Sequence, residues 1–152
     1  NVEKYLTQHD VWFESLEHEP TYTANHLARA THTIQQEVAK SVLVHADDRL
    51  ALVVVPASFN VDLELVAEVL AARRATLASE AECGHEFVDC EFGARLPFGS
   101  QYGLMTVMDE SLREDEEITF EANTHRKAVR MKLADYLELE RPLIATVTQR
   151  YY

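Results

Sequence analysis

The sequence predicts an α/β fold of the α+β kind, with a mixed, partly barrel-like β-sheet flanked by short helices. Two runs rich in β-branched residues, Ser41–Ala46 and Leu50–Pro56, are separated by only three residues, which favours a hairpin. Most of the other expected strands have no full crossover helix between them, so the sheet should be largely antiparallel or mixed. With 152 residues and 47% hydrophobic content, we expect residues 1–152 to form one domain, which can have been cut from a longer chain.

The first third of the chain predicts two short helices and a strand. Apolar residues recur at helical spacing from Val2 and predict a short N-terminal helix. The segment Val11–Leu16 has the composition of a strand. Thr23 is a typical N-cap residue and predicts a helix over Ala24–Ala30.

The middle of the chain contains the clearest helix. Leu50–Pro56 is apolar on both faces, which is typical of a central strand. Asn60 can cap the helix that follows. Its expected apolar stripe is Val61, Leu65, Val66, Val69 and Leu70. Ser79 and Glu82 have the spacing of a capping box and predict a further short helix, which Gly84 weakens or ends.

The last third of the chain alternates short strands with helical turns. The expected strands are Leu104–Met108, Ile118–Glu121 and Ala128–Met131. Glu110–Arg113 should form a turn of helix, and Leu133–Leu139 a final helix.

The formal net charge of −12 argues against a protein that coats nucleic acid without regard to sequence. A local basic site is still compatible with it, since Arg126, Lys127, Arg130 and Lys132 lie close together in the chain. The acidic run Asp109–Glu117 is typical of a solvated surface. No apolar run is long enough to cross a bilayer, and the start lacks a signal-peptide pattern, so we expect a cytoplasmic protein.

The two cysteines, Cys83 and Cys90, suit a reducing compartment and provide no disulfide framework. His85 lies between them, but the paired spacing of a zinc site is missing, so we expect buried thiols and no metal. The chain has no nucleophile elbow, P-loop or dinucleotide fingerprint, and we expect no cofactor.

Three of the four glycines, Gly93, Gly99 and Gly103, fall within the segment Glu91–Gly103, together with Pro97. Glycine is concentrated where the backbone takes a positive φ or where another group approaches closely. Such a loop is either a binding loop held by a rigid scaffold or a long structural turn.

Two further residues have both a structural and a functional interpretation. Lys40 enters the first apolar strand, either as an edge residue that extends its ammonium to solvent or as a cation directed into a cleft. His125 follows Asn123, which tolerates a left-handed conformation, so a tight turn presenting the histidine is expected. A lone histidine is more often a structural hydrogen-bonding residue.

Five segments in order resemble the YbaK and prolyl-tRNA-synthetase-associated editing domain, a family of aminoacyl-tRNA deacylases. They span most of the chain and are Ala39–Val44, Leu50–Ser58, Asp89–Gly99, Met108–Leu112 and Phe120–His125. Ala39 and Lys40 match the family pattern before the strand, as do Gly93, Pro97, Phe98 and Gly99 in the loop. The usual Gly-x-His is replaced by Asn123, Thr124 and His125, and Arg95 and Leu96 also depart from the pattern.

The resemblance implies hydrolysis of the ester that joins a wrong, small amino acid (alanine, serine or cysteine) to tRNA, most often tRNA for proline. It implies catalytic roles for Lys40, which would hold the terminal phosphate or the developing charge, and for Gly93, whose surrounding N–H groups could face the carbonyl. The substrate-binding residues would be Pro97, Phe98, Gly99, Asp109, Asn123 and His125. The residues meeting the acceptor stem would be Arg126, Lys127, Arg130 and Lys132.

The expected partners are the acceptor end of aminoacyl-tRNA and an aminoacyl-tRNA synthetase, with no membrane. The acidic balance and the altered loop leave a second hypothesis open. In it, the domain keeps the fold without catalysis and recruits tRNA or a synthetase, or serves as a sensor.

Overall fold

The computed structural model describes residues 2–19, 27, 31, 37–79, 81–83 and 96–149. Its helices are α1 (Val2–Gln8), α3 (Leu63–Val69) and α5 (Leu133–Glu140), with 3-10 helices η2 (Gly99–Tyr102) and η3 (Glu110–Glu114). Its strands are β1 (Phe13–Glu17), β2 (Ala39–Ala46), β3 (Arg49–Pro56), β4 (Ala75–Leu77), β5 (Met105–Asp109), β6 (Glu117–Glu121), β7 (Lys127–Lys132) and β8 (Leu143–Ala145). The predicted mixed α/β class is confirmed.

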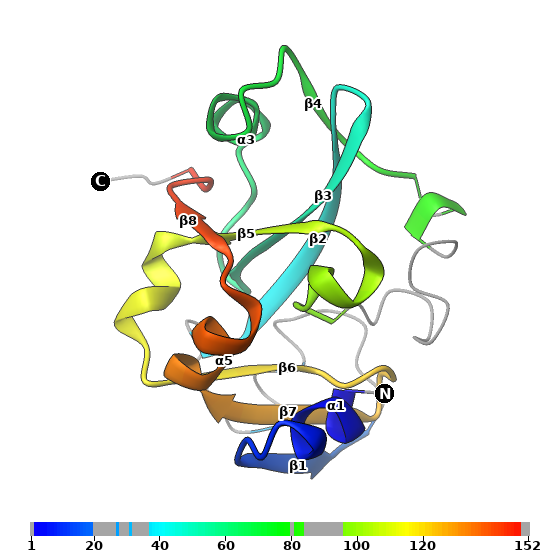
Figure 1. Cartoon of the computed structure of the whole chain (residues 1–152), viewed down its shortest axis with the longest axis vertical. Coiled ribbons are helices and arrows are strands. Elements are labelled where there is room, and N and C mark those ends of the chain that lie inside the picture. The colour runs from blue at the N-terminus through cyan, green and yellow to red at the C-terminus, as the bar shows by residue number, and fades with distance from the viewer. Residues whose placement is uncertain are drawn as a thin grey trace.

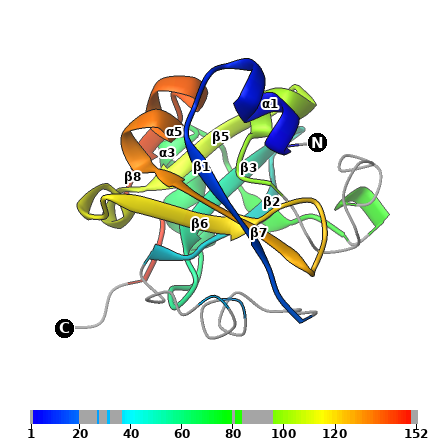
Figure 2. The same cartoon turned by 90° about the horizontal axis from the view of Figure 1, so that it is seen from below.

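The strands form two sheets. The larger sheet has the order β4-β2-β3-β5-β8, and the smaller has the order β1-β7-β6. Seen from below, the three-stranded sheet lies in front of the five-stranded one (Figure 2). A parallel bridge between Val38 and Thr119 connects the start of β2 with β6. The start of β2, where Lys40 lies, is therefore at the junction of the two sheets.

The strands β2 and β3 form the predicted hairpin, with paired residues from Ala39 and Pro56 to Ala46 and Arg49. Asp47 in the turn adopts a φ of 56°, a conformation that aspartate tolerates better than most residues. β3 pairs antiparallel with β2 and parallel with β5, so the expectation of a central strand is confirmed. β3 is therefore the middle strand of the larger sheet.

Apolar side chains cover both faces of β3. Leu52 and Val54 belong to a main core cluster that also contains residues of β6, β7, α1 and α5. Val53 and Val55 belong to a second cluster with Val66 of α3. In Figure 1, α3 lies beside β4 at the end of the molecule away from the three-stranded sheet. None of the described helices is long and apolar enough to cross a membrane.

The N-cap of α3 differs from the prediction. Asp62, and not Asn60, caps the helix, because its Oδ1 accepts hydrogen bonds from the N–H groups of Glu64 (3.0 Å) and Leu65 (3.2 Å). The carbonyl of Asn60 instead accepts a hydrogen bond from the N–H of Gln149. Asn60 therefore belongs to the pairing with the C-terminal segment, a long-range contact that local spacing does not reveal.

The sequence analysis did not predict two short strands and one 3-10 helix. One predicted helix lies mostly outside the described residues. The strands β4 and β8 have three residues each, too few for a period-two pattern, and η2 begins at a glycine. Of the predicted helix Ala24–Ala30, the structure describes only Leu27, which is fully buried. Cys83 is buried, as expected, whereas Cys90 lies outside the described residues.

Candidate active site

Lys40 lies on β2 directly opposite Val55 of β3 and is partly buried. Burial lowers the pKa of its ammonium, because removing a cation from water disfavours the charged form. Among the described residues, no hydrogen-bond acceptor or carboxylate pairs with this ammonium. A partly buried lysine is compatible both with an ammonium that extends to solvent and with a cation directed into a site, so the catalytic role of Lys40 stays a prediction.

The turn between β6 and β7 contains the expected left-handed residue. Asn123 has a φ of 69°, and its side-chain Oδ1 accepts a hydrogen bond from the N–H of Val2 (3.1 Å). His125 is 6% exposed, and its Nδ1 lies 3.3 Å from a carboxylate oxygen of Glu121. The carboxylate fixes the orientation of the imidazole ring. The turn therefore holds His125 rigidly and leaves it little contact with solvent.

The described half of the glycine loop, residues 96–103, is held by core packing. Phe98 is fully buried and makes edge-to-face contacts with Tyr5, Phe120 and Tyr136 at centroid distances of 5.6, 5.7 and 5.2 Å. The carbonyl of Pro97 accepts a hydrogen bond from the Tyr136 hydroxyl (2.6 Å). Phe98 is thus a core residue that supports the loop, and its direct contact with substrate stays a prediction.

Both described glycines of the loop, Gly99 and Gly103, lie where a side chain would be unfavourable. A Cβ on Gly99 would overlap Thr106 Oγ1 and lie 3.1 Å from the carbonyl oxygen of Leu104. Gly103 has a φ of 70° and ends η2. Gly93, the predicted catalytic glycine, lies outside the described residues.

Asp109 is fully buried at the end of β5. Its Oδ1 accepts hydrogen bonds from the N–H of Val147 (2.9 Å) and from Thr148 Oγ1 (3.1 Å). Its Oδ2 accepts from the N–H and the hydroxyl of Ser111. This carboxylate ties the C-terminal segment to the larger sheet, so it shapes the fold around any pocket, and a direct contact with substrate stays a prediction.

Lys40 and Phe98 are not brought together. Side chains alternate between the faces of a strand, so Lys40 shares a face of β2 with Val42 and Val44, which pack in the second cluster. Phe98 packs in the main cluster on the other face.

The four predicted tRNA-binding residues do not form one free basic surface. Arg126 is exposed in the turn before β7. The other three lie on β7, each opposite an acidic residue of a neighbouring strand: Lys127 opposite Glu17, Arg130 opposite Glu14, and Lys132 opposite Glu117. Arg130 and Glu14 form an ion pair at 3.0 Å. Opposite charges at paired positions stabilise a sheet, so part of this basic segment serves the sheet itself.

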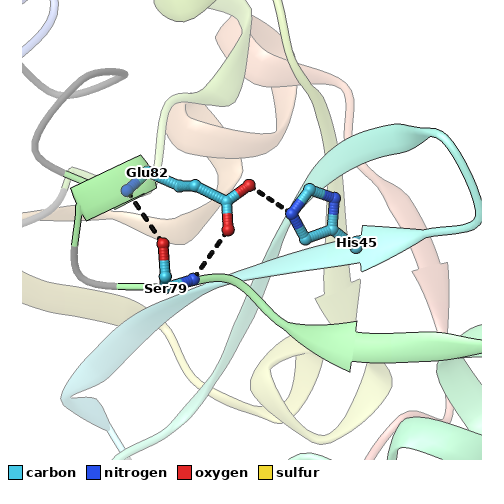
Figure 3. Close-up of polar contacts among 3 residues, drawn as sticks. All are labelled: His45, Ser79 and Glu82. Atoms are coloured by element: carbon cyan, nitrogen blue, oxygen red, sulfur yellow. Dashed lines mark hydrogen bonds and ion pairs between the residues drawn. The ribbon is translucent and has the colours of Figure 1, made fainter.

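A serine, a glutamate and a histidine meet beside β2, an arrangement that the sequence analysis did not anticipate (Figure 3). The predicted capping box is confirmed, because the N–H of Ser79 donates to Glu82 Oε1 (2.9 Å) and the N–H of Glu82 donates to Ser79 Oγ (3.2 Å). The second oxygen of Glu82 binds His45 Nε2. Hydrogen bonds from Ser79 lead among the causes that lower the pKa of Glu82.

This trio is not a nucleophilic triad. A triad needs the histidine next to the serine hydroxyl so that it can accept the proton. Here the carboxylate lies between the serine and the histidine, and Ser79 Oγ accepts a hydrogen bond from the backbone. The trio fixes the capping box of Ser79 and Glu82 to β2.

Together, these features define a mixed α/β protein of two sheets, with a partly buried lysine at the start of β2, a histidine turn between β6 and β7, and a glycine loop anchored in the main core. The aminoacyl-tRNA editing domain family matches residues 18–139. The chain therefore belongs to that family, which confirms the class of protein indicated by the five segments, the aminoacyl-tRNA deacylases.

Known relatives and solved structures agree with this assignment. The chain is 31% identical over 142 residues to the multifunctional Ser/Thr-tRNA deacylase ProXp-y of Escherichia coli K12, covering 90% of this chain and 84% of that protein. The fold matches the hypothetical protein APE2540 with a TM-score of 0.88 at 17% identity, over 97% of this chain and 99% of that one. It also matches a candidate trans-editing enzyme for prolyl-tRNA synthetase with a TM-score of 0.85 at 20% identity, over 98% and 95% of the two chains.

Proposed function

We propose that this protein is a cytoplasmic trans-editing deacylase that removes a small, wrongly attached amino acid from tRNA. The observation that carries the proposal is the half-buried ammonium of Lys40, with its lowered pKa and no partner among the described residues. Serine is the first choice of amino acid and threonine the second, because the E. coli relative is named for both. Alanine and cysteine are the remaining small candidates, and tRNA for proline is the first tRNA to test.

The proposed chemistry needs no covalent nucleophile. An aminoacyl ester is already activated, so hydrolysis requires a positioned water molecule and stabilisation of the oxyanion. Lys40 would bind the terminal phosphate or the developing negative charge as a compact point charge. Backbone N–H groups around Gly93 would face the ester carbonyl, and the ribose hydroxyl next to the ester would help to activate the water.

The remaining predicted residues would act by shaping the pocket. The left-handed turn at Asn123 and the carboxylate of Glu121 hold the ring of His125 in place, which suits a pocket wall. Because the loop segment at Pro97 is anchored in the core, it can keep its position when the acceptor end enters. We assign neither Asp109 nor His125 as a general base.

The test is hydrolysis of defined misacylated tRNAs. Transfer RNA for proline is charged separately with serine, threonine, alanine, cysteine and proline, and release of each amino acid is followed with wild-type protein and with Lys40→Ala. Lys4→Ala, which removes an exposed lysine of α1, is the matched control. We expect wild type and the control to release serine or threonine and Lys40→Ala to be at least about 100-fold slower, as for loss of an oxyanion-stabilising group.

Failure to release any of these amino acids by the folded wild-type protein would contradict the proposal. It would favour the second hypothesis, a non-catalytic module that recruits tRNA or a synthetase. The observations in favour of that hypothesis are the net charge of −12 and the altered loop at Arg95 and Leu96. The pairing of basic residues on β7 with acids favours a synthetase over tRNA as the partner of such a module. Retention of tRNA or prolyl-tRNA synthetase on the immobilised protein, without turnover, would support it.

A further inference from the structure

Two residues of the helix α5, spaced four apart, form hydrogen bonds with the glycine loop. Tyr136 and Glu140 lie on one face of the helix, and both are buried. The Tyr136 hydroxyl donates to the carbonyl of Pro97 (2.6 Å). Glu140 accepts hydrogen bonds from the N–H of Ser100 (3.0 Å) and from Ser100 Oγ (2.6 Å).

Thr106 of β5 connects the same carboxylate to Gly99. Its hydroxyl donates to Glu140 Oε2 (2.6 Å) and accepts a hydrogen bond from the N–H of Gly99 (3.0 Å). Glu140 therefore accepts hydrogen bonds from three donors. One of them, the Thr106 hydroxyl, also binds the backbone N–H of Gly99 in the loop. The backbone of the loop is therefore held at three residues, Pro97, Gly99 and Ser100, by side chains of α5 and β5.

The carboxylate of Glu140 is buried and is bound by hydrogen bonds without an ion pair among the described residues. It is 9% exposed and forms no ion pair with the described lysines, arginines or histidines. Its negative charge contributes, after burial, to raising the pKa of both Tyr136 and Tyr5. Removing this carboxylate would leave three hydrogen-bond donors without their acceptor, which destabilises a protein, and an acceptor with one oxygen would not serve all three.

We propose that Glu140, acting through Thr106 and Ser100, is a positioning residue that sets the backbone of the glycine loop for deacylation. The inference rests on the proposed function, in which Pro97 and Gly99 are substrate-binding residues. The anchor holds the backbone of both residues directly, so an error in the anchor would displace them. A displacement of about 1 Å can lower a rate by about 100-fold.

The test compares the steady-state kinetics of Glu140→Gln, Thr106→Val and Thr106→Ser with wild type on tRNA for proline charged with serine or with threonine. Glu140→Gln keeps the shape but turns an amide NH2 toward donors. Thr106→Val removes the hydroxyl at similar volume, and Thr106→Ser keeps it. Glu138→Gln, on the exposed side of α5, is the control. All assays are run well below the melting temperature of each variant.

We expect Glu140→Gln and Thr106→Val to lower kcat by about 10- to 100-fold, with KM within about twofold of wild type. Thr106→Ser and Glu138→Gln should stay close to wild type. In addition, amide hydrogen exchange at Ser100 should become faster in Glu140→Gln while exchange in β3 is unchanged.

Three outcomes would overturn the inference. Wild-type kcat in both Glu140→Gln and Thr106→Val would show that the anchor does not serve the reaction. If Thr106→Ser and Thr106→Val lower kcat equally, and in proportion to the loss of folded protein, the role of the hydroxyl is purely structural. If the wild-type protein is inactive, the proposed function is wrong and the inference fails with it. The wild-type assay is therefore run before any variant is compared.

Discussion

Gly99 and Thr106 approach each other so closely that no side chain fits between them. A Cβ on Gly99 would overlap Thr106 Oγ1, and the same hydroxyl accepts the hydrogen bond of the Gly99 N–H at 3.0 Å. The hydroxyl is also bound to Glu140, so it cannot rotate away without breaking a second hydrogen bond. The glycine is thus required by a close approach, and its φ is not in the left-handed region.

We expect Gly99→Ala to destabilise the protein by about 1–3 kcal/mol, as for overpacking of a tight site. The free energy of unfolding is measured by urea denaturation. The double variant Gly99→Ala/Thr106→Ala should show a favourable coupling, because the second change removes the overlapping atom. Strictly additive effects of the two changes would contradict the close approach.

The turn at Asn123 provides a second test through a matched pair of substitutions. Both Asn123→Gly and Asn123→Ala lose the hydrogen bond to the N–H of Val2. Alanine must also adopt the left-handed φ of 69°, which costs about 1–2 kcal/mol more than in glycine. We therefore expect Asn123→Ala to unfold at lower urea concentration than Asn123→Gly. Equal midpoints would contradict a strained backbone at this position.

The raised pKa of Asp115 should make the stability of the protein depend on pH. Burial, followed by the charges of Glu37 and Glu114, raises this pKa from 3.8 to about 6. The Oδ2 of Asp115 is buried and has no hydrogen-bond partner among the residues that the structure describes. Between these two pKa values the folded state binds more protons than the unfolded state, so stability falls as the pH rises from about 4 to above 6.

Asp115→Asn should remove this fall and raise the melting temperature at pH 7.5, with less effect at pH 4. The measurement is thermal unfolding at half-unit steps from pH 4 to pH 8, with Glu110→Gln, an exposed residue of η3, as the control. A loss of stability at pH 7.5 in Asp115→Asn would show that the carboxylate is needed in its ionised form.

The basic residues near β7 should contribute unequally to tRNA binding. Arg126 is exposed, whereas Arg130 is paired with Glu14 at 3.0 Å. If Arg126 contacts a phosphate, Arg126→Ala should reduce the slope of log K against log salt by about 0.7 to 0.9. Arg130→Ala should leave that slope nearly unchanged and lower stability by about 0.2–1 kcal/mol. The reverse ranking in filter-binding titrations would mean that the ion pair opens to bind tRNA.

Much of the local structure could be read from the sequence. The hairpin of β2 and β3, the capping box of Ser79 and Glu82, and the left-handed turn at Asn123 each depend on residues that are close in the chain. Such contacts leave a pattern of spacing or residue type, and that pattern is visible without a fold. The editing family could also be recognised from five short segments in order.

The candidate site depends on contacts that no local pattern records. Glu140 meets Ser100 across 40 residues of the chain and Thr106 across 34, and Asp109 meets Val147 across 38. A buried glutamate at the end of a helix resembles a solvated one in the sequence, since its environment comes from distant elements. Likewise, the acids opposite Lys127, Arg130 and Lys132 are set by strand register.

The sequence by itself determined the elements and the family, because hydrophobic periodicity and turn residues act over a few neighbouring positions. Only the tertiary structure decided that Lys40 is half-buried without a described partner, that Phe98 supports the loop from the core, and that Glu140 holds the loop backbone. Burial and long-range hydrogen bonding are properties of the packed chain, and they exist only once distant elements have come together.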